Sequence, residues 1–217
     1  MKIEILSATQ TAAQHLRDMI VIGELRPGQK INETQLASEM GLSRPPLREA
    51  FRILESECLI TNIPRKSKFV SNISKDDFEK IYFTRRMIEC FSIDLIKMKG
   101  IKDFTPLYQS LEEASSKKLD IEDSPREILE CLKSFAEFHI KLVEITRNPY
   151  LLHFYQSISS NLLRYQFLYF SKKYKKPLLD EHLQIFQLIQ RGDYEQAKDY
   201  LISHINYSFE EIIREGF

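Results

Sequence analysis

The chain has 217 residues, which is enough for one large domain or two small ones. Its 31 basic and 31 acidic residues balance, so any surface that binds a polyanion must be a local cluster of basic side chains. The cysteines Cys58, Cys90 and Cys131 are odd in number and far apart, which argues against a disulfide framework and a cysteine zinc site. No run approaches the ~20 apolar residues of a membrane span, and the N-terminus lacks the apolar core of a signal peptide, so we expect a cytoplasmic protein.

Residues 7–22 predict an amphipathic first helix that begins at Ser7. Its apolar side chains recur at helical spacing and are expected to face inward: Ala12, Leu16, Met19 and Ile20. Arg26-Pro27-Gly28 then predicts a turn.

Two short helices with a tight turn between them are predicted next. Asn32 and Gln35 have the spacing of a capping box, and Gly41 is placed to end that helix in the left-handed conformation. Ser43 can cap the following helix, whose first turn tolerates Pro45 because the N–H groups there have no intrahelical acceptor.

The second of these helices carries two stripes. Its apolar stripe is formed by Leu47, Phe51 and Leu54, and its basic stripe by Arg44, Arg48 and Arg52. Like charges at this spacing repel, so the basic row gives an isolated helix no stability, whereas a polyanion would benefit from it. A solvated face is the alternative, but a helix, a glycine-containing turn and an arginine-bearing helix form the layout that enters the DNA major groove.

A basic hairpin is predicted to follow. Leu59–Ile63 and Lys68–Ile73 are β-rich runs separated by Pro64-Arg65-Lys66-Ser67, and we expect them to form a two-stranded wing. Residues 1–73 contain ten basic and eight acidic side chains, so this part has an excess charge of +2 and the remainder −2. A monomer is therefore expected to bind DNA weakly.

The run GELRPGQKINETQLASEMGLSRPPLREAFRILESECLI resembles the winged helix-turn-helix of the GntR family of bacterial transcription regulators. The resemblance covers most of residues 7–73 and implies that Arg44 and Arg48 contact base edges and phosphates. Cys58 and Ser67 stand where the family usually has glycine, which adopts a positive φ more easily. The predicted DNA-binding residues are Thr34, Ser43, Arg44, Arg48, Arg52, Arg65, Lys66 and Lys68.

Helical periodicity continues from Ser74 to the end of the chain. The predicted helices span residues 75–98, 103–117, 124–147, 149–173, 177–191 and 193–215. The sequence therefore predicts a mainly α protein, with a winged helix-turn-helix domain at 1–73 and an all-helical bundle at 74–217 for effector binding and dimerisation.

Three histidines lie on the expected inward faces of three different helices, namely His139, His182 and His204. Neutral imidazoles that converge from several helices can hold a transition metal, and histidines that only fill the core are the alternative. The spacing alone leaves both open.

The second half is similar to the FCD effector-binding domain of the FadR subfamily, through RRMIE, FHIKLVEITRNPYL and EHLQIFQLIQRGDYEQAKDYLISHI. Many members hold a divalent metal with an aspartate and three histidines. The resemblance places His139, His182 and His204 at the histidine positions and Phe135 at the aspartate position. Two interpretations follow. Three neutral ligands still suit zinc or nickel, and a carboxylate effector could supply the missing negative charge. Alternatively, Phe135 fills a site that no longer binds metal. Arg86, which matches the arginine of the family's RxxE, and Arg164 are the predicted clamps for an effector carboxylate.

These patterns predict a ligand-responsive DNA-binding transcriptional regulator, most simply a repressor and not an enzyme, that binds a pseudo-palindromic operator as a homodimer. Two alternatives remain at this point. One is a metal-dependent hydrolase built on the three histidines, and the other is a regulator without metal whose ligand is hydrophobic or absent.

Overall fold

The computed structural model describes residues 7–64, 67–117, 124–173 and 178–216 of the chain. The chain divides into two compact units, Met1–Ile73 and Ser74–Phe217. None of the helices in the described part of the chain is both long and apolar enough to cross a membrane.

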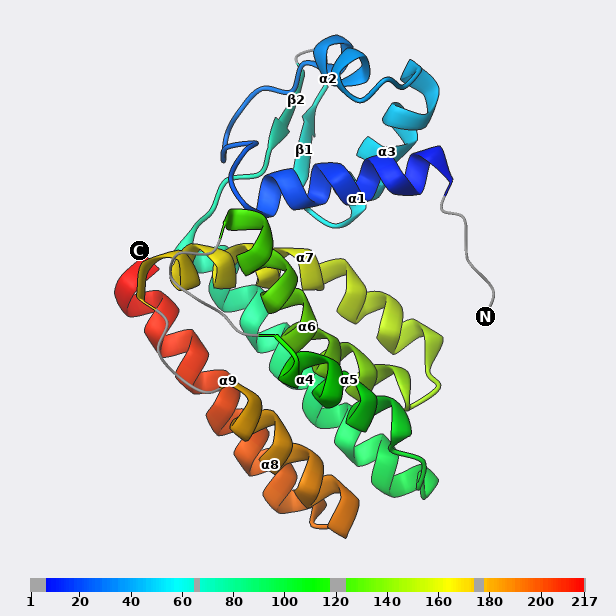
Figure 1. The fold of residues 1–217 in the computed structure, drawn as a ribbon, viewed down its shortest axis with the longest axis vertical. Helices are drawn as coiled ribbons and strands as arrows, with labels where there is room; N and C mark the ends of the chain where they lie inside the picture. The colour runs from blue at the N-terminus through cyan, green and yellow to red at the C-terminus, as the bar shows by residue number, and fades with distance from the viewer. Residues whose placement is uncertain (1–6, 65–66, 118–123, 174–177, 217) are drawn as a thin grey trace. The chain divides into compact units, whose positions relative to one another are not determined.

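The first unit is a winged helix-turn-helix (Figure 1). Its helices are α1 (Ala8–Val21), α2 (Glu33–Glu39) and α3 (Arg44–Ser56). The strands β1 (Ile60–Ile63) and β2 (Ser67–Val70) pair antiparallel, with Ile60 opposite Val70 and Ile63 opposite Ser67. The predicted order of elements is therefore present.

Two of the predicted helix caps differ in detail from the structure. The side chain of Asn32 accepts from the backbone N–H of Gln35 at 3.1 Å, but Gln35 donates to Glu39 instead of completing a capping box. Ser43 is the N-cap residue of α3, yet its side chain makes no capping hydrogen bond. The turn between these helices contains Gly41 at φ +63°, which is the left-handed conformation predicted for it.

The core of the first unit forms where α1 packs against α3. Its largest fully buried side chains, at most 1% exposed, are Leu16, Ile20, Leu47, Phe51, Leu54 and Leu59. At the edge of this core the guanidinium of Arg17 makes a two-pronged contact with the carboxylate of Glu57, at 2.8 and 2.7 Å. This bidentate pair fixes the end of α3 against α1.

Cys58 adopts a left-handed backbone with φ +57°, although it has a side chain. The turn after α3 therefore has the conformation that a glycine would favour, and this chain forms it with a cysteine. The cost of such a conformation for a residue with a Cβ is about 1–2 kcal/mol, which the packing on either side must offset.

The described residues of the second unit form six helices: α4 (Lys75–Lys99), α5 (Thr105–Ser115), α6 (Pro125–Glu144), α7 (Pro149–Lys173), α8 (Leu178–Arg191) and α9 (Tyr194–Gly216). The fold is mainly α, as predicted. Helix α6 begins at a complete capping box made by Ser124 and Glu127, and α4 ends at Gly100, which has φ +60°. Helix α6 ends three residues earlier than predicted, because Arg147 turns the chain with φ +52° before Asn148 and Pro149.

Helix α4 lies at the centre of this bundle and packs against α6, α7 and α9 (Figure 1). At its start the ring of Phe78 lies 4.6 Å from that of Tyr165 on α7, and the ring of Tyr82 lies 4.7 Å from that of Phe209 on α9. The hydroxyl of Tyr165 donates to the backbone carbonyl of Ser74 at 3.2 Å. Helices α7 and α9 therefore hold the first two turns of α4.

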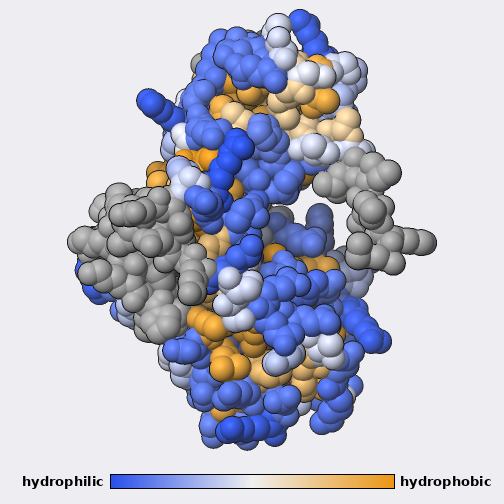
Figure 2. Space-filling view, viewed as in Figure 1, coloured by the Kyte–Doolittle hydropathy of each residue, from blue (hydrophilic) through white to orange (hydrophobic). Residues whose placement is uncertain are grey.

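Apolar side chains also reach the surface of the helical unit, between hydrophilic ones (Figure 2). On α4 these exposed side chains recur every one or two turns: Phe83, Met87, Phe91 and Met98. On α7 the rings of Tyr150 and Phe154 are exposed as well. A face of this kind is available for contact with another protein surface.

Candidate functional site

The basic stripe predicted on α3 lies at the surface of the first unit. Arg44 is exposed, and the side chains of Arg48 and Arg52 are 62% and 73% exposed. The guanidinium of Arg44 also donates to the hydroxyl of Thr34 on α2 at 3.4 Å, which joins two of the predicted DNA contacts. Buried Leu47 and Phe51 fix the opposite side of α3, so the arginines point away from the core.

Glu33, at the start of α2, contacts two of the predicted DNA-binding cations. Its carboxylate lies 3.6 Å from Arg48 on α3 and 3.5 Å from Lys68 on β2. Lys68 also lies 3.4 Å from Glu55, and its side chain is only 19% exposed. Lys68 is therefore held between two carboxylates, whereas Arg65 and Lys66 lie outside the described residues.

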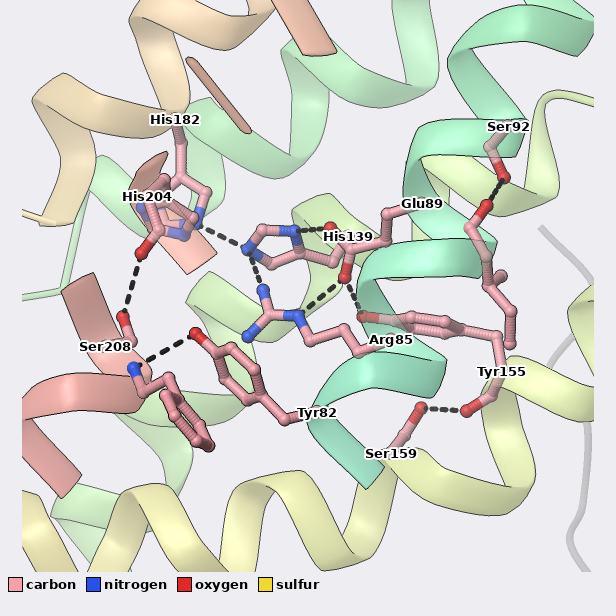
Figure 3. Close-up of polar contacts among 12 residues, drawn as sticks. Tyr82, Arg85, Glu89, Ser92, His139, Tyr155, Ser159, His182, His204 and Ser208 are labelled. Carbon is pink, nitrogen blue, oxygen red and sulfur yellow. Dashed lines mark hydrogen bonds and ion pairs between the residues drawn. The ribbon is translucent and has the colours of Figure 1, made fainter. Parts of the chain in front are cut away.

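The second unit brings its three predicted histidines together in its interior (Figure 3). His139 comes from α6, His182 from α8 and His204 from α9, and all three are buried. One ring nitrogen of each lies within 4.8 Å of the others. Neighbouring apolar residues, such as Phe138 and Leu142 on α6, orient these rings inward.

His139 lies at the centre of a network with Arg85 and Glu89 of α4 (Figure 3). Its Nδ1 lies 2.8 Å from Oε2 of Glu89, and a carboxylate only accepts, so Nδ1 carries the proton. Nε2 of His139 then offers a lone pair, and it lies 2.8 Å from Nη2 of Arg85 and 2.9 Å from Nε2 of His182. A guanidinium only donates, so Arg85 donates to the nitrogen that would otherwise bind a metal.

Glu89 is fully buried and is held by three donors. Its Oε1 accepts from Nε of Arg85 and from the hydroxyl of Tyr155, both at 2.7 Å, while Oε2 faces His139. Burial alone would raise the pKa of Glu89, but Arg85 and His139 outweigh it and hold that pKa well below its usual range. Glu89 is therefore ionised, and its charge balances that of Arg85.

Burial lowers the pKa of His139 to about 4, and Glu89 offsets only part of this effect. The ring is therefore neutral near pH 7, in agreement with the hydrogen bonds it makes. His204 makes a similar contact, since its Nδ1 lies 2.7 Å from Oε2 of Glu181. Because Glu181 accepts from Nδ1, the lone pair of His204 is on Nε2, on the side of the ring away from Glu181. Metal-binding imidazoles are oriented by carboxylates in the same way.

The arginine that contacts His139 is Arg85, one residue before the predicted Arg86. Arg86 is partly exposed, and its guanidinium lies over the ring of Phe83 at 5.3 Å. Arg164, the second predicted clamp, is buried in α7, and burial lowers its pKa to about 10. The sequence contains the relevant signal, because Arg85 is four residues before Glu89 and shares the buried face of α4 with Phe78 and Tyr82.

Phe135 lies at the position where the family resemblance expects an aspartate. Its ring is roughly parallel to that of His182, at 5.9 Å between centroids. Glu137, the next acidic residue along α6, lies 3.2 Å from Lys141 instead. An apolar ring therefore lies against His182 at the position where the resemblance expects an anionic ligand.

A cavity of about 30 Å³ lies beside the network and is lined in part by Arg85, His139, Tyr155 and Ser159. This volume accommodates one or two water-sized groups but not a metabolite. A larger ligand at Arg85 therefore requires the surrounding helices or side chains to move.

The donor set itself fits a transition metal. Three neutral imidazoles suit zinc or nickel, and ring nitrogens within 4.8 Å of one another need only small shifts to reach Zn–N distances of about 2.0–2.1 Å. The guanidinium of Arg85 would have to move before such an ion binds, because it already donates to Nε2 of His139. His139, His182 and His204 would hold such an ion, which would polarise a bound oxygen ligand.

Comparisons with known proteins agree with this arrangement of a DNA-reading unit and a histidine-containing helical bundle. Residues 8–70 match the family described as bacterial regulatory proteins, gntR family, and residues 80–207 match the FCD domain. The chain therefore belongs to the GntR family of transcriptional regulators, in the group that carries an FCD domain, and it is a DNA-binding regulator of transcription.

Among individual relatives, the chain is similar to the HTH-type transcriptional regulator YdhC of Bacillus subtilis. The two are 27% identical over 205 residues, which is 93% of this chain and 90% of YdhC. The gluconate operon transcriptional repressor of Bacillus licheniformis is 24% identical over 210 residues, 92% of this chain and 81% of the relative. The solved structure of E. coli McbR/YncC shares the fold, with a TM-score of 0.78, 16% identity, and coverage of 98% of this chain and 100% of that one.

Proposed function

We propose that this chain is a repressor that binds a pseudo-palindromic operator as a homodimer in the cytoplasm and changes its DNA affinity when a small carboxylate effector binds the helical unit. The observation that carries the DNA-binding part is the exposed row of Arg44, Arg48 and Arg52 on α3, directly after the turn at Gly41. One recognition helix covers only a few base pairs, so two copies are needed for specific affinity.

The exposed apolar side chains of α4 support the dimer. Phe83, Met87 and Phe91 are 54%, 66% and 45% exposed and follow one another at successive turns. Large apolar side chains at this spacing form a continuous face, and such a face is stabilised when a second protein surface covers it.

The buried network supports an effector that contains a carboxylate. Arg85 lies 2.8 Å from Nε2 of His139, and its planar guanidinium can bind a carboxylate through two parallel hydrogen bonds. Zinc or nickel on His139, His182 and His204 would complete such a site and bind the same anion. The size of the cavity implies that the effector acts by changing the packing of the helices, which shifts the population of states that match the operator.

The hydrolase alternative has less support. Among the residues that the structure describes, Glu89 and Glu181 contact the histidines, and each already accepts a hydrogen bond from an imidazole. A general base must instead be directed at a water or substrate molecule.

The operator can be found by selecting bound DNA from a random pool with the full-length protein. An inverted repeat with half-sites about 10 base pairs apart, or a multiple of that spacing, is expected. Light scattering of the complex should show two chains per operator. Unrelated or single half-sites in the selected pool would contradict the dimer, and an operator affinity that no carboxylate changes at fixed salt would contradict the effector.

A further inference from the structure

We infer that Arg85 is an internal competitor for the metal site: its guanidinium occupies the lone pair of His139 that a transition metal needs, so Arg85 must leave before the three histidines can bind a metal. This inference rests on the proposed metal-binding role of the histidines. Arg85 would thereby regulate metal binding, which neither the family match nor the positions of the three histidines imply by themselves.

The first reason is the contact between Arg85 and His139. Nε2 of His139 lies 2.8 Å from Nη2 of Arg85, and the other ring nitrogen is fixed as a donor by Glu89 at 2.8 Å. A neutral imidazole has one lone pair on its ring nitrogens. That lone pair cannot be shared between a guanidinium at hydrogen-bond distance and a metal ion.

The second reason is the electrostatic repulsion between the guanidinium of Arg85 and a metal ion. Arg85 and Glu89 are both buried, their side chains 3% and 0% exposed, and their charges cancel. Adding a dication next to an unmoved guanidinium would place like charges a few ångströms apart in the protein interior, which is strongly unfavourable. Phe135 adds no negative charge against His182 that could offset this repulsion.

Arg85 is also held in place from its other side. Its Nε donates to Oε1 of Glu89 at 2.7 Å, and the same oxygen accepts from Tyr155 on α7. The competitor is therefore anchored on its own helix, four residues from its carboxylate partner. When Arg85 leaves His139 it becomes available to a carboxylate effector, so metal and anion would favour the same rearranged state.

The test compares zinc affinity in full-length proteins freed of tags and metals, by competition with a chromophoric chelator. Arg85→Met alone would leave Glu89 buried without its cation, so the informative pair is Glu89→Gln and the double variant Arg85→Met/Glu89→Gln. The glutamine carbonyl can still accept from Nδ1 of His139, while its NH2 group faces the hydroxyl of Tyr155, which can accept instead of donating. Both variants share this glutamine, so their difference reports Arg85. The double variant should bind zinc on the order of 10- to 100-fold more tightly than Glu89→Gln, which is the range in which neighbouring groups change metal affinity.

Arg86→Met is the matched control, because it removes the adjacent guanidinium, which lies over Phe83 and not against a histidine. Its zinc affinity should equal that of the wild type. Equal affinities of Glu89→Gln and the double variant would overturn the inference. Absence of zinc binding in every variant would also overturn it, and DNA binding by the same samples would show separately whether the regulator function stands.

A measurement on the unmodified protein avoids dependence on the folding of any variant. Nitrogen NMR of the arginine and histidine side chains should show the Arg85 guanidinium signals and the His139 Nε2 signal changing together as zinc is added. Zinc-dependent change at His139 with unchanged Arg85 signals would contradict competition.

Discussion

The two units of this chain use arginine in opposite ways. In the helix-turn-helix unit, Arg48 and Arg52 are largely exposed and their ion pairs are weak surface contacts. In the helical unit, Arg85 is almost fully buried and is fixed by Glu89 and His139. A cation that must meet DNA phosphates has to stay solvated until DNA replaces the water, whereas one that organises a site must be held by permanent partners.

The comparison predicts that the buried arginine matters most for stability. Arg85→Ala should lower the free energy of unfolding by about 3–5 kcal/mol, because it leaves the buried carboxylate of Glu89 without its cation. Urea unfolding followed by circular dichroism would measure this. Arg86→Ala, one residue along the same helix, should change it by less than ~0.5 kcal/mol, and equal effects of the two substitutions would contradict the burial argument.

The exposed arginines should matter for DNA and not for folding. Arg48→Ala should cost about 1–3 kcal/mol of operator binding if its guanidinium contacts a base edge. Titrations of the selected operator and of a scrambled sequence at the same salt would measure this. An equal loss on both DNAs would show a phosphate contact, and an unchanged affinity on both would remove Arg48 from the DNA surface.

A smaller effect is expected at the turn after α3. Cys58→Gly should stabilise the first unit by about 1 kcal/mol, because glycine adopts φ +57° without the strain of a Cβ. Hydrogen exchange of the α3 amides in the full chain would report the opening free energy of this unit. Cys58→Ala removes the thiol but keeps the Cβ, so it should show no such gain; equal protection in the two variants would exclude backbone strain as the cause.

The smallest effect concerns Glu33, whose carboxylate faces two of the predicted DNA-binding cations. Glu33→Gln should leave the fold intact and release Arg48 and Lys68, so the dependence of DNA affinity on salt should steepen by about one to two phosphate contacts. Affinity for scrambled DNA should rise more than affinity for the operator. Glu39→Gln, on the same helix, is the control, and a salt dependence equal to that of the wild type in Glu33→Gln would show that these ion pairs do not limit binding.

The sequence predicts the local features well because they depend on neighbours along the chain. The positions of the helices, the left-handed Gly41 and the outward row on α3 all follow from capping chemistry and periodicity. The inward faces of His139, His182 and His204 follow from the same periodicity. That they meet in space depends on how α6, α8 and α9 pack, which no spacing along the chain records.

The same reasoning explains what sequence analysis missed. The family's RxxE pattern points to Arg86, but the arginine that contacts His139 is Arg85, which is four residues from Glu89, a spacing that also places two side chains on one helical face. The contact of Tyr155 with Glu89 joins residues 66 positions apart and has no local signal. The resemblance therefore points to α4, and the structure places the neighbouring arginine of this helix against His139.

The hydrogen bond from Tyr165 to the carbonyl of Ser74 has a mechanical consequence. Ser74 is the first residue of the helical unit and caps α4. The chain therefore enters this unit at a residue that a side chain of α7 holds by a hydrogen bond. A displacement of α7 would therefore also displace the backbone at Ser74. A movement of α7 would thus reach the residue at which the helical unit begins.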